Sequence, residues 1–159
     1  MVARRILLAS SIALTITGCV TAPTMSQLAM DAQVIAAGLT ATLPALAGIA
    51  GISATTRVAL QSYLSDVQSA ASAIVATTAG AAPVSAVQML VRAVNAAVAV
   101  ITSAPVNALI PASIEAVFVA ASALLPGIEA AAGLLAAADA PGKMPPDTAR
   151  LILKAAAGG

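Results

Sequence analysis

Residues 84–101, VSAVQMLVRAVNAAVAVI, decide the expected fold, because their apolar side chains recur with the period of an α-helix. The aliphatic residues that return every three or four positions are Val84, Val87, Val91, Val94, Val98 and Ile101. This spacing places them along one side of a helix and leaves Arg92 and Asn95 facing outward. Pro83 suits the first turn, where its missing N–H would have no intrahelical partner. We therefore predict a helix over 83–102 whose apolar face requires helical partners.

Two further helices are predicted upstream of this stretch. The first covers about 26–43, with Ser26 as its N-cap, and ends where Pro44 and two glycines interrupt the pattern. Its apolar stripe consists of Leu28, Ile35, Leu39 and either Leu43 or Leu46. The second begins after Ser53, which can cap it, and runs to about Thr78. Its stripe is Leu60, Leu64, Val67, Ala71 and Ile74, while Arg57, Gln61, Asp66 and Gln68 lie at other angles.

Proline residues divide the sequence downstream. Pro105 and Pro111 bracket a connector, and Pro111 is placed to start another helix. The apolar positions of that helix are Ile114, Val117 or Phe118, Ala121, and Leu124 or Leu125. We expect Pro126 and Gly127 to bend the chain into a separate segment over 128–138. A polar hinge follows, and Pro145-Pro146-Asp147 opens a short terminal helix that carries Leu151, Ile152 and Leu153.

The chain has the composition of an all-α protein. Alanine accounts for 44 of the 159 residues, and it has the highest helix propensity of any residue. Helices joined by short Gly/Pro connectors usually pack antiparallel, and alanine at the contacts lets their axes approach closely. We predict one Ala-rich domain over 26–159, folded as a small antiparallel helical bundle of four to six helices. Weak similarity of 31–37 to 115–121 and of 55–60 to 148–153 leaves open a duplicated helical hairpin.

Few residues are charged, and this excludes several classes of partner. From Cys19 onward five basic residues face six acidic ones, which gives a formal net charge of −1. We find no basic stripe suited to nucleic acid and no polybasic patch suited to anionic lipid. Mean hydropathy is high, at +1.02, but alanine and valine supply much of it, and alanine only weakly favours a bilayer. Hydropathy alone therefore does not identify a membrane-spanning protein.

The first 19 residues have the organisation of an export signal. Arg4 and Arg5 precede an apolar run of 11 residues, Ile6 to Ile16, which is well short of the roughly 20 needed to span a bilayer as a helix. Thr17, Gly18 and Cys19 follow, and Cys19 is the only cysteine in the chain. A single thiol in an exported protein cannot form an internal disulfide.

The end of this segment resembles the lipobox of bacterial lipoproteins, with Ile16, Thr17 and Gly18 as the peptidase recognition residues before Cys19. The resemblance implies that Cys19 receives a diacylglycerol, that residues 1–18 are removed as a signal peptide, and that the new amino group is acylated. Residues 19–25 then form a tether to the domain. Val20, where enterobacterial lipoproteins retained on the inner membrane carry Asp, implies the periplasmic face of the outer membrane. The alternatives are an ordinary secretory signal cleaved elsewhere and a retained amino-terminal anchor.

The sequence offers little catalytic chemistry. Histidine is absent, which excludes His-type metal sites, Ser-His pairs and an imidazole base, and the anchor would use the one thiol. None of the six carboxylates pairs with another at i, i+3 or i, i+4, and we expect all of them on solvated helix surfaces. They are Asp31, Asp66, Glu115, Glu129, Asp139 and Asp147. Tyr63 and Phe118 are expected in the core or at its edge. We therefore expect no catalytic site, no metal and no cofactor other than the acyl groups on Cys19.

Two functions compete at this stage. The first is a non-enzymatic lipoprotein of the cell envelope, which acts as a structural or protein-interaction module and contacts membrane lipid through Cys19. The alternative is a membrane-active protein or a prophage lysis accessory, holin-like or spanin-like. It is favoured by charge-free stretches at 32–56, 67–91 and 93–114, although these stretches contain proline and many polar residues. An enzyme is the third and least supported reading.

Overall fold

The computed structural model describes residues 24–77, 83–134 and 144–158. Every regular element within these residues is helical, as the sequence predicts. The elements are α1 (Met25–Ala41), α2 (Leu43–Gly48), α3 (Ala54–Ala76), α4 (Val84–Thr102), the 3-10 turn η1 (Val106–Ala108), α5 (Ala112–Ala131) and α6 (Pro146–Gly158). The expected lipobox, Cys19 and the signal peptide lie outside the described residues.

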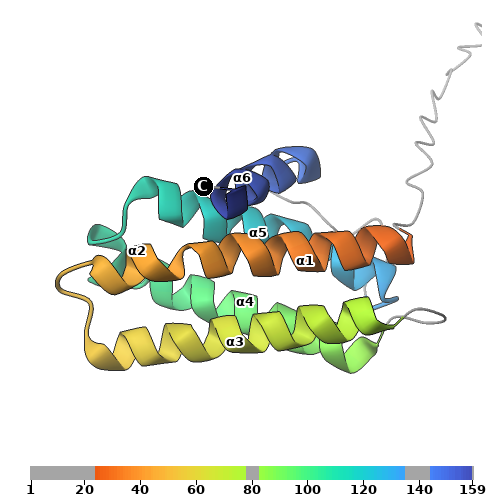
Figure 1. Cartoon of the computed structure of the whole chain (residues 1–159), viewed down its shortest axis with the longest axis horizontal. Helices are drawn as coiled ribbons and strands as arrows, with labels where there is room; N and C mark the ends of the chain where they lie inside the picture. The colour runs from red at the N-terminus through yellow and green to blue at the C-terminus, as the bar shows by residue number, and fades with distance from the viewer. Residues whose placement is uncertain (1–23, 78–82, 135–143, 159) are drawn as a thin grey trace, which may run out of the picture.

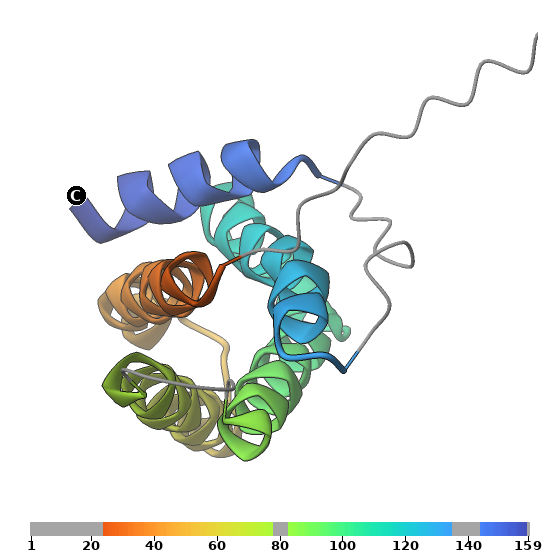
Figure 2. The ribbon, with the colours of Figure 1, turned by 90° about the vertical axis from the view of Figure 1, so that its right-hand side faces the viewer.

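Four long helices form an antiparallel bundle, and a fifth lies on its outside. Helices α1, α3, α4 and α5 follow one another around the bundle in chain order, each running opposite to the one before (Figure 1). Helix α5 closes the ring by packing on α1. The terminal helix α6 crosses the outer surface of α1 and α5 at a steep angle to the bundle axis (Figure 2). The predicted small helical bundle is therefore confirmed.

Helix α4 is the most amphipathic of the four bundle helices, but its buried face is displaced from the predicted stripe. Val87, Val94 and Ile101 are fully buried, whereas Val84 is exposed and Val91 and Val98 are only partly buried. The face is completed by Ala86, Leu90, Ala93 and Ala97. The predicted stripe omitted these three alanines and also the large side chain Leu90, because the buried face is rotated toward the side of α4 that packs on α3 and α5. Arg92 and Asn95 are exposed, as predicted.

Helix α3 follows the sequence prediction closely. The Ser53 side chain accepts a hydrogen bond from the Thr56 N–H at 3.1 Å, which caps the helix as expected. All five predicted stripe residues, from Leu60 to Ile74, are buried. Phe118 of α5 lies in the core, and Tyr63 of α3 is partly buried at its edge.

The first helix begins earlier and ends earlier than predicted. Thr24 is the N-cap and accepts a long hydrogen bond from the Gln27 N–H at 3.4 Å, so Ser26 lies inside α1 and the last tether residue is already helical. At the other end Thr42 terminates α1, and Pro44 occupies the first turn of the separate helix α2. Because proline has no N–H to continue the hydrogen-bond ladder of α1, it starts a new helix there instead of a loop.

Helix α5 continues through Pro126, where the sequence predicted a bend. Leu124, Leu125 and Ile128 are buried around the proline, so packing outweighs the missing hydrogen bond. The helix ends at Ala131, and Gly133 follows with a φ of +71°. The Leu134 N–H binds the Glu129 carbonyl at 2.9 Å and the Gly133 N–H binds the Ala130 carbonyl at 3.1 Å, which is a Schellman termination. Of the predicted segment 128–138, residues 135–138 lie outside the described residues.

Candidate functional site

The predicted lipidation residues Ile16, Thr17, Gly18 and Cys19 are not among the described residues, but the start of the folded domain is. Thr24, the first residue that the structure describes, lies at the end of the bundle where α3 ends and α4 begins (Figure 1). Helix α2, η1 and the connector after α4 lie at the opposite end. The bundle thus has one end from which the chain leads back to the expected lipobox, and a second end on its opposite side.

A charged cluster fixes α6 to α1. Asp31 of α1 is 6% exposed, and its carboxylate accepts two hydrogen bonds from Arg150 of α6, from Nε at 2.7 Å and from Nη2 at 2.8 Å. The remaining terminal nitrogen, Nη1, binds the exposed Asp147 at 2.9 Å. Asp31 therefore contradicts the expectation that the carboxylates are solvated, because a partner 119 residues away makes its burial favourable.

The cluster shifts the ionisation of its arginine. The hydrogen bonds that Arg150 donates to Asp31 raise the pKa of Arg150 further above its usual value, although partial burial works in the opposite direction. Because the pKa of Arg150 is raised in the folded state, the stabilisation that comes from its charge is fully present at neutral pH and declines as the pH rises into the strongly alkaline range. Arg150 is thus a permanent cation in a structural ion pair.

The other described carboxylates lie apart from this cluster. Asp66, Glu115 and Asp147 are exposed, and Glu129 is partly exposed, in line with the sequence prediction. Within the described ranges there is no group of three or more His, Cys, Asp or Glu side chains that could hold a metal ion. The expected Asp139 lies outside the described residues.

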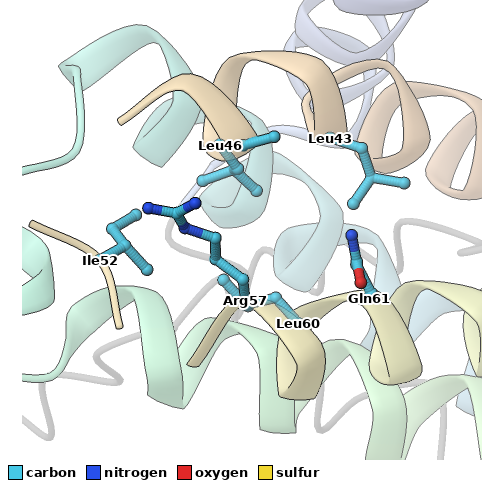
Figure 3. Close-up of a pocket in the computed structure, with 7 residues that line it drawn as sticks. Leu43, Leu46, Ile52, Arg57, Leu60 and Gln61 are labelled. Atoms are coloured by element: carbon cyan, nitrogen blue, oxygen red, sulfur yellow. The ribbon is translucent and has the colours of Figure 1, made fainter. Parts of the chain in front are cut away.

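A small cavity beside Arg57 lies at the end of the bundle remote from Thr24. It measures about 20 Å³ and opens partly to solvent between α2 and the start of α3 (Figure 3). The lining residues are Leu43, Leu46, Ala47, Ile52, Arg57, Leu60 and Gln61. Most of the wall is aliphatic, and the guanidinium of Arg57 projects across it toward Leu46 and Ile52.

The polar atoms of Arg57 are poorly satisfied. Its Nε is buried and has no hydrogen-bond partner in the structure. Nη2 donates to the Ile49 carbonyl at 3.5 Å, which is longer than an ordinary N–H···O bond. The sequence reading placed Arg57 off the apolar stripe, yet Arg57, Leu60 and Leu64 follow i, i+3, i+7 spacing. That spacing was the available signal that Arg57 faces the core edge.

Three wider grooves run along the sides of the bundle. The groove between α3 and α4 has a volume of about 420 Å³ and is lined by residues that include Tyr63, Asp66, Met89 and Arg92. A second, of about 500 Å³, lies between α1 and α3, where Gln68 Nε2 donates to Thr40 Oγ1 at 2.9 Å. A third, of about 360 Å³, lies between α1 and α6. These are open surfaces and not enclosed sites, so they suit contact with another macromolecule better than capture of a small substrate.

Comparison with protein-family models, with curated protein sequences and with solved structures gives no significant match for this chain.

Proposed function

We propose that the protein is a non-enzymatic lipoprotein of the bacterial cell envelope, anchored through acyl groups on Cys19, whose helical bundle is a structural or protein-interaction module. The observation that carries the proposal is the order of features: Arg4 and Arg5, a short apolar run, the lipobox-like residues 16–19, and a folded helix beginning at Met25. Two or three acyl chains anchor a protein to a membrane durably, at about 0.8 kcal/mol per buried methylene. The proposed location is the periplasmic face of the outer membrane.

The proposal constrains how the bundle stands on the membrane. The five peptide units between Cys19 and Thr24 extend over at most about 18 Å. The end of the bundle that contains Thr24 and the start of α4 therefore faces the lipid, and α2 and η1 face away from it. The surfaces available to a partner in the envelope are the bundle sides and this remote end.

Metabolic labelling tests the anchor directly. Cells that express the full chain are grown with radiolabelled palmitate, and the protein is then immunoprecipitated and compared with its Cys19→Ser variant. We expect label in the wild-type chain and none in the variant. Equal labelling of both chains, or no labelling of either, contradicts the proposal. Cys19→Ser is preferable to Cys19→Ala because it changes the sulfur to oxygen and little else.

One observation favours the membrane-active alternative. Three segments among the described residues are long and apolar enough to cross a membrane by length and composition: Met25–Gly48, Val84–Thr102 and Ala112–Ala131. The first of these contains Asp31, which is buried in an ion pair with Arg150, and each segment buries one side in the bundle core. Separation of these helices into a bilayer would break that ion pair.

Alkaline extraction separates the two candidate functions. The test protein carries Cys19→Ser and has residues 1–18 replaced by an ordinary cleavable secretory signal, so that no leader remains to hold it on the membrane. A bundle that depends on its acyl anchor is recovered in the soluble fraction. Retention of this variant in the carbonate-washed membrane pellet supports the membrane-active function instead.

A further inference from the structure

The proposed function assigns no partner to the side of the bundle that α3 and α4 form. Helix α6 covers α1 and α5, and α3 and α4 lie on the far side of the bundle from it (Figure 2). We propose that the α3/α4 side binds a second copy of the same chain, and that a two-fold axis parallel to the bundle axis relates the two copies. The contact belongs to the folded bundle and does not require Cys19 to be acylated.

The groove between α3 and α4 is lined by residue types that protein–protein interfaces favour. Tyr63 of α3 is partly buried in its wall, and Met89 of α4 is 46% exposed. The exposed Arg92 lines the same groove. Tyrosine, methionine and arginine are enriched in interfaces relative to the rest of a protein surface. Ala93 and Ala96 also line the groove, and such small side chains let a facing helix approach closely.

The two charged residues of this groove favour a second copy as the partner. Asp66 of α3 and Arg92 of α4 are both exposed, and within the described part of the chain neither forms an ion pair. One acid and one base leave the groove without net charge, so it does not select a strongly acidic or strongly basic partner. A surface with one charge of each sign is complementary to itself after a two-fold rotation, which is the usual symmetry of homodimers.

The positions of the two charges along their helices determine the direction of the axis. Helix α3 ends at Ala76 and α4 begins at Val84, at the same end of the bundle (Figure 1). At about 1.5 Å per residue, Asp66 lies about 15 Å from that end and Arg92 about 12 Å from it. A two-fold axis parallel to the bundle axis keeps every residue at its own height, so Asp66 of each copy faces Arg92 of the other. It also leaves both Thr24 ends on one side, where under the proposed function both acyl anchors reach the same membrane.

Photo-crosslinking in cells tests the contact with the full chain. The photoreactive amino acid p-benzoylphenylalanine replaces Met89, and two differently tagged copies are expressed together and irradiated. We expect a product of twice the chain mass that carries both tags. Leu151, which is 68% exposed on α6, is the matched control position and should give no such product. The inference is overturned if neither position or both positions give this product, or if the probe at Met89 captures only a different protein.

Charge reversal tests whether Asp66 and Arg92 face each other across the contact. The groove carries two bases in Asp66→Arg and two acids in Arg92→Asp, so each variant expressed alone brings like charges together. We expect each variant alone to reduce the product of the Met89 probe by at least about tenfold. Expression of the two variants together should restore the product, because every arginine then faces an aspartate.

The mixture separates a lost contact from a lost fold. A folding defect in either variant would not be repaired by the other variant, so recovery in the mixture requires the proposed pairing. If the mixture gives no more product than the single variants do, the inference is overturned. Palmitate labelling of the same cells reports the acyl anchor separately, so failure of the dimer and failure of the anchor are distinguishable. The wild-type crosslink decides the matter even if a variant does not fold.

Discussion

At the scale of single residues, the contact between Asp31 and Arg150 joins the first long helix to the last. Both oxygens of Asp31 are used, and the arginine side chain is 21% exposed, so the pair lies between a surface ion pair and a fully buried one. Surface pairs contribute up to about 1 kcal/mol, whereas breaking a fully buried pair costs about 3 to 5 kcal/mol. The structure places this pair between those two ranges.

Asp31→Asn is predicted to lower the free energy of unfolding by about 2 kcal/mol, because it leaves the Arg150 charge partly buried without its counterion. Asp147→Asn is the matched control, since Asp147 touches the same guanidinium from an exposed position. We expect it to change stability by less than about 0.5 kcal/mol. Urea denaturation followed by circular dichroism measures both. Equal effects of the two substitutions would show that the buried pair has no special role.

Gly38 of α1 is a second residue on which the packing of α6 depends. A Cβ atom at this position would lie 2.7 Å from Leu153 Cδ2 and 3.1 Å from the Leu153 carbonyl oxygen. The side chain can move, but the backbone of α6 can do so only if the helix shifts. Glycine is therefore needed at Gly38 for close packing of α1 on α6, even though it weakens α1 itself.

Gly38→Ala is predicted to destabilise the protein by about 1 to 2 kcal/mol, because overpacking outweighs the gain of about 1 kcal/mol in helix propensity. Gly127→Ala, inside α5 with nothing within 4 Å of the new Cβ, should instead stabilise it by about 0.5 to 1 kcal/mol. Hydrogen exchange should show faster exchange in α6 of the first variant only. Stabilisation by both substitutions would contradict the close approach of α6 to Gly38.

At the scale of helices, Pro126 is the sharpest disagreement between sequence and structure. Proline inside a helix costs about 3 kcal/mol, and local sequence rules therefore end the helix before it. In the structure Leu124, Leu125 and Ile128 all point into the core, so one continuous helix buries more apolar surface than two separate segments would.

Pro126→Ala is predicted to raise the free energy of unfolding by about 1 to 2 kcal/mol. It restores the hydrogen bond that the proline cannot donate, and the greater freedom of the unfolded chain offsets part of the gain. Urea denaturation measures the change. If α5 ended at Pro126, as the sequence alone suggested, the alanine variant would be no more stable than the wild type.

Most of the helices could be predicted because their signals are local. Ser53 caps α3, Pro83 and Pro111 immediately precede α4 and α5, and the stripe from Leu60 to Ile74 is buried as expected. Errors arose where distant packing decides the outcome: Pro126 stays helical, and Pro44 starts α2 instead of ending the regular structure. The spacing of apolar residues shows which of them share one face of a helix. It does not show which other helix packs against that face.

The charged residues also show that local signals could be predicted and distant contacts could not. Asp31 looked like a surface carboxylate because its partner, Arg150, is far away in sequence and no local pattern connects them. Arg57 was closer to prediction, since its spacing from Leu60 indicates the core side of α3. Its poor hydrogen bonding could not be predicted, because it depends on where α2 and the Ile49 carbonyl lie. The duplication hypothesis stays a prediction.

At the scale of the whole molecule, a very apolar chain forms a bundle that buries most of its large aliphatic side chains, although Met30, Val58 and Leu151 are exposed. Leucine, isoleucine and valine fill the core, while alanine, serine and glutamine make up much of the outside. High mean hydropathy therefore arises here without a helix that must cross a bilayer, although three segments have the length and composition to do so. The proposed function therefore assigns membrane attachment to Cys19 and not to the bundle.

Intact-mass spectrometry of the protein purified from bacterial membranes tests most directly whether acyl groups on Cys19 attach the protein to the membrane. We predict the mass of residues 19–159 plus a thioether-linked diacylglyceryl group and one amide-linked acyl chain, with fragment ions that assign all the added mass to Cys19. A chain that begins at any other residue, or one that begins at Cys19 without added lipid, would contradict the account.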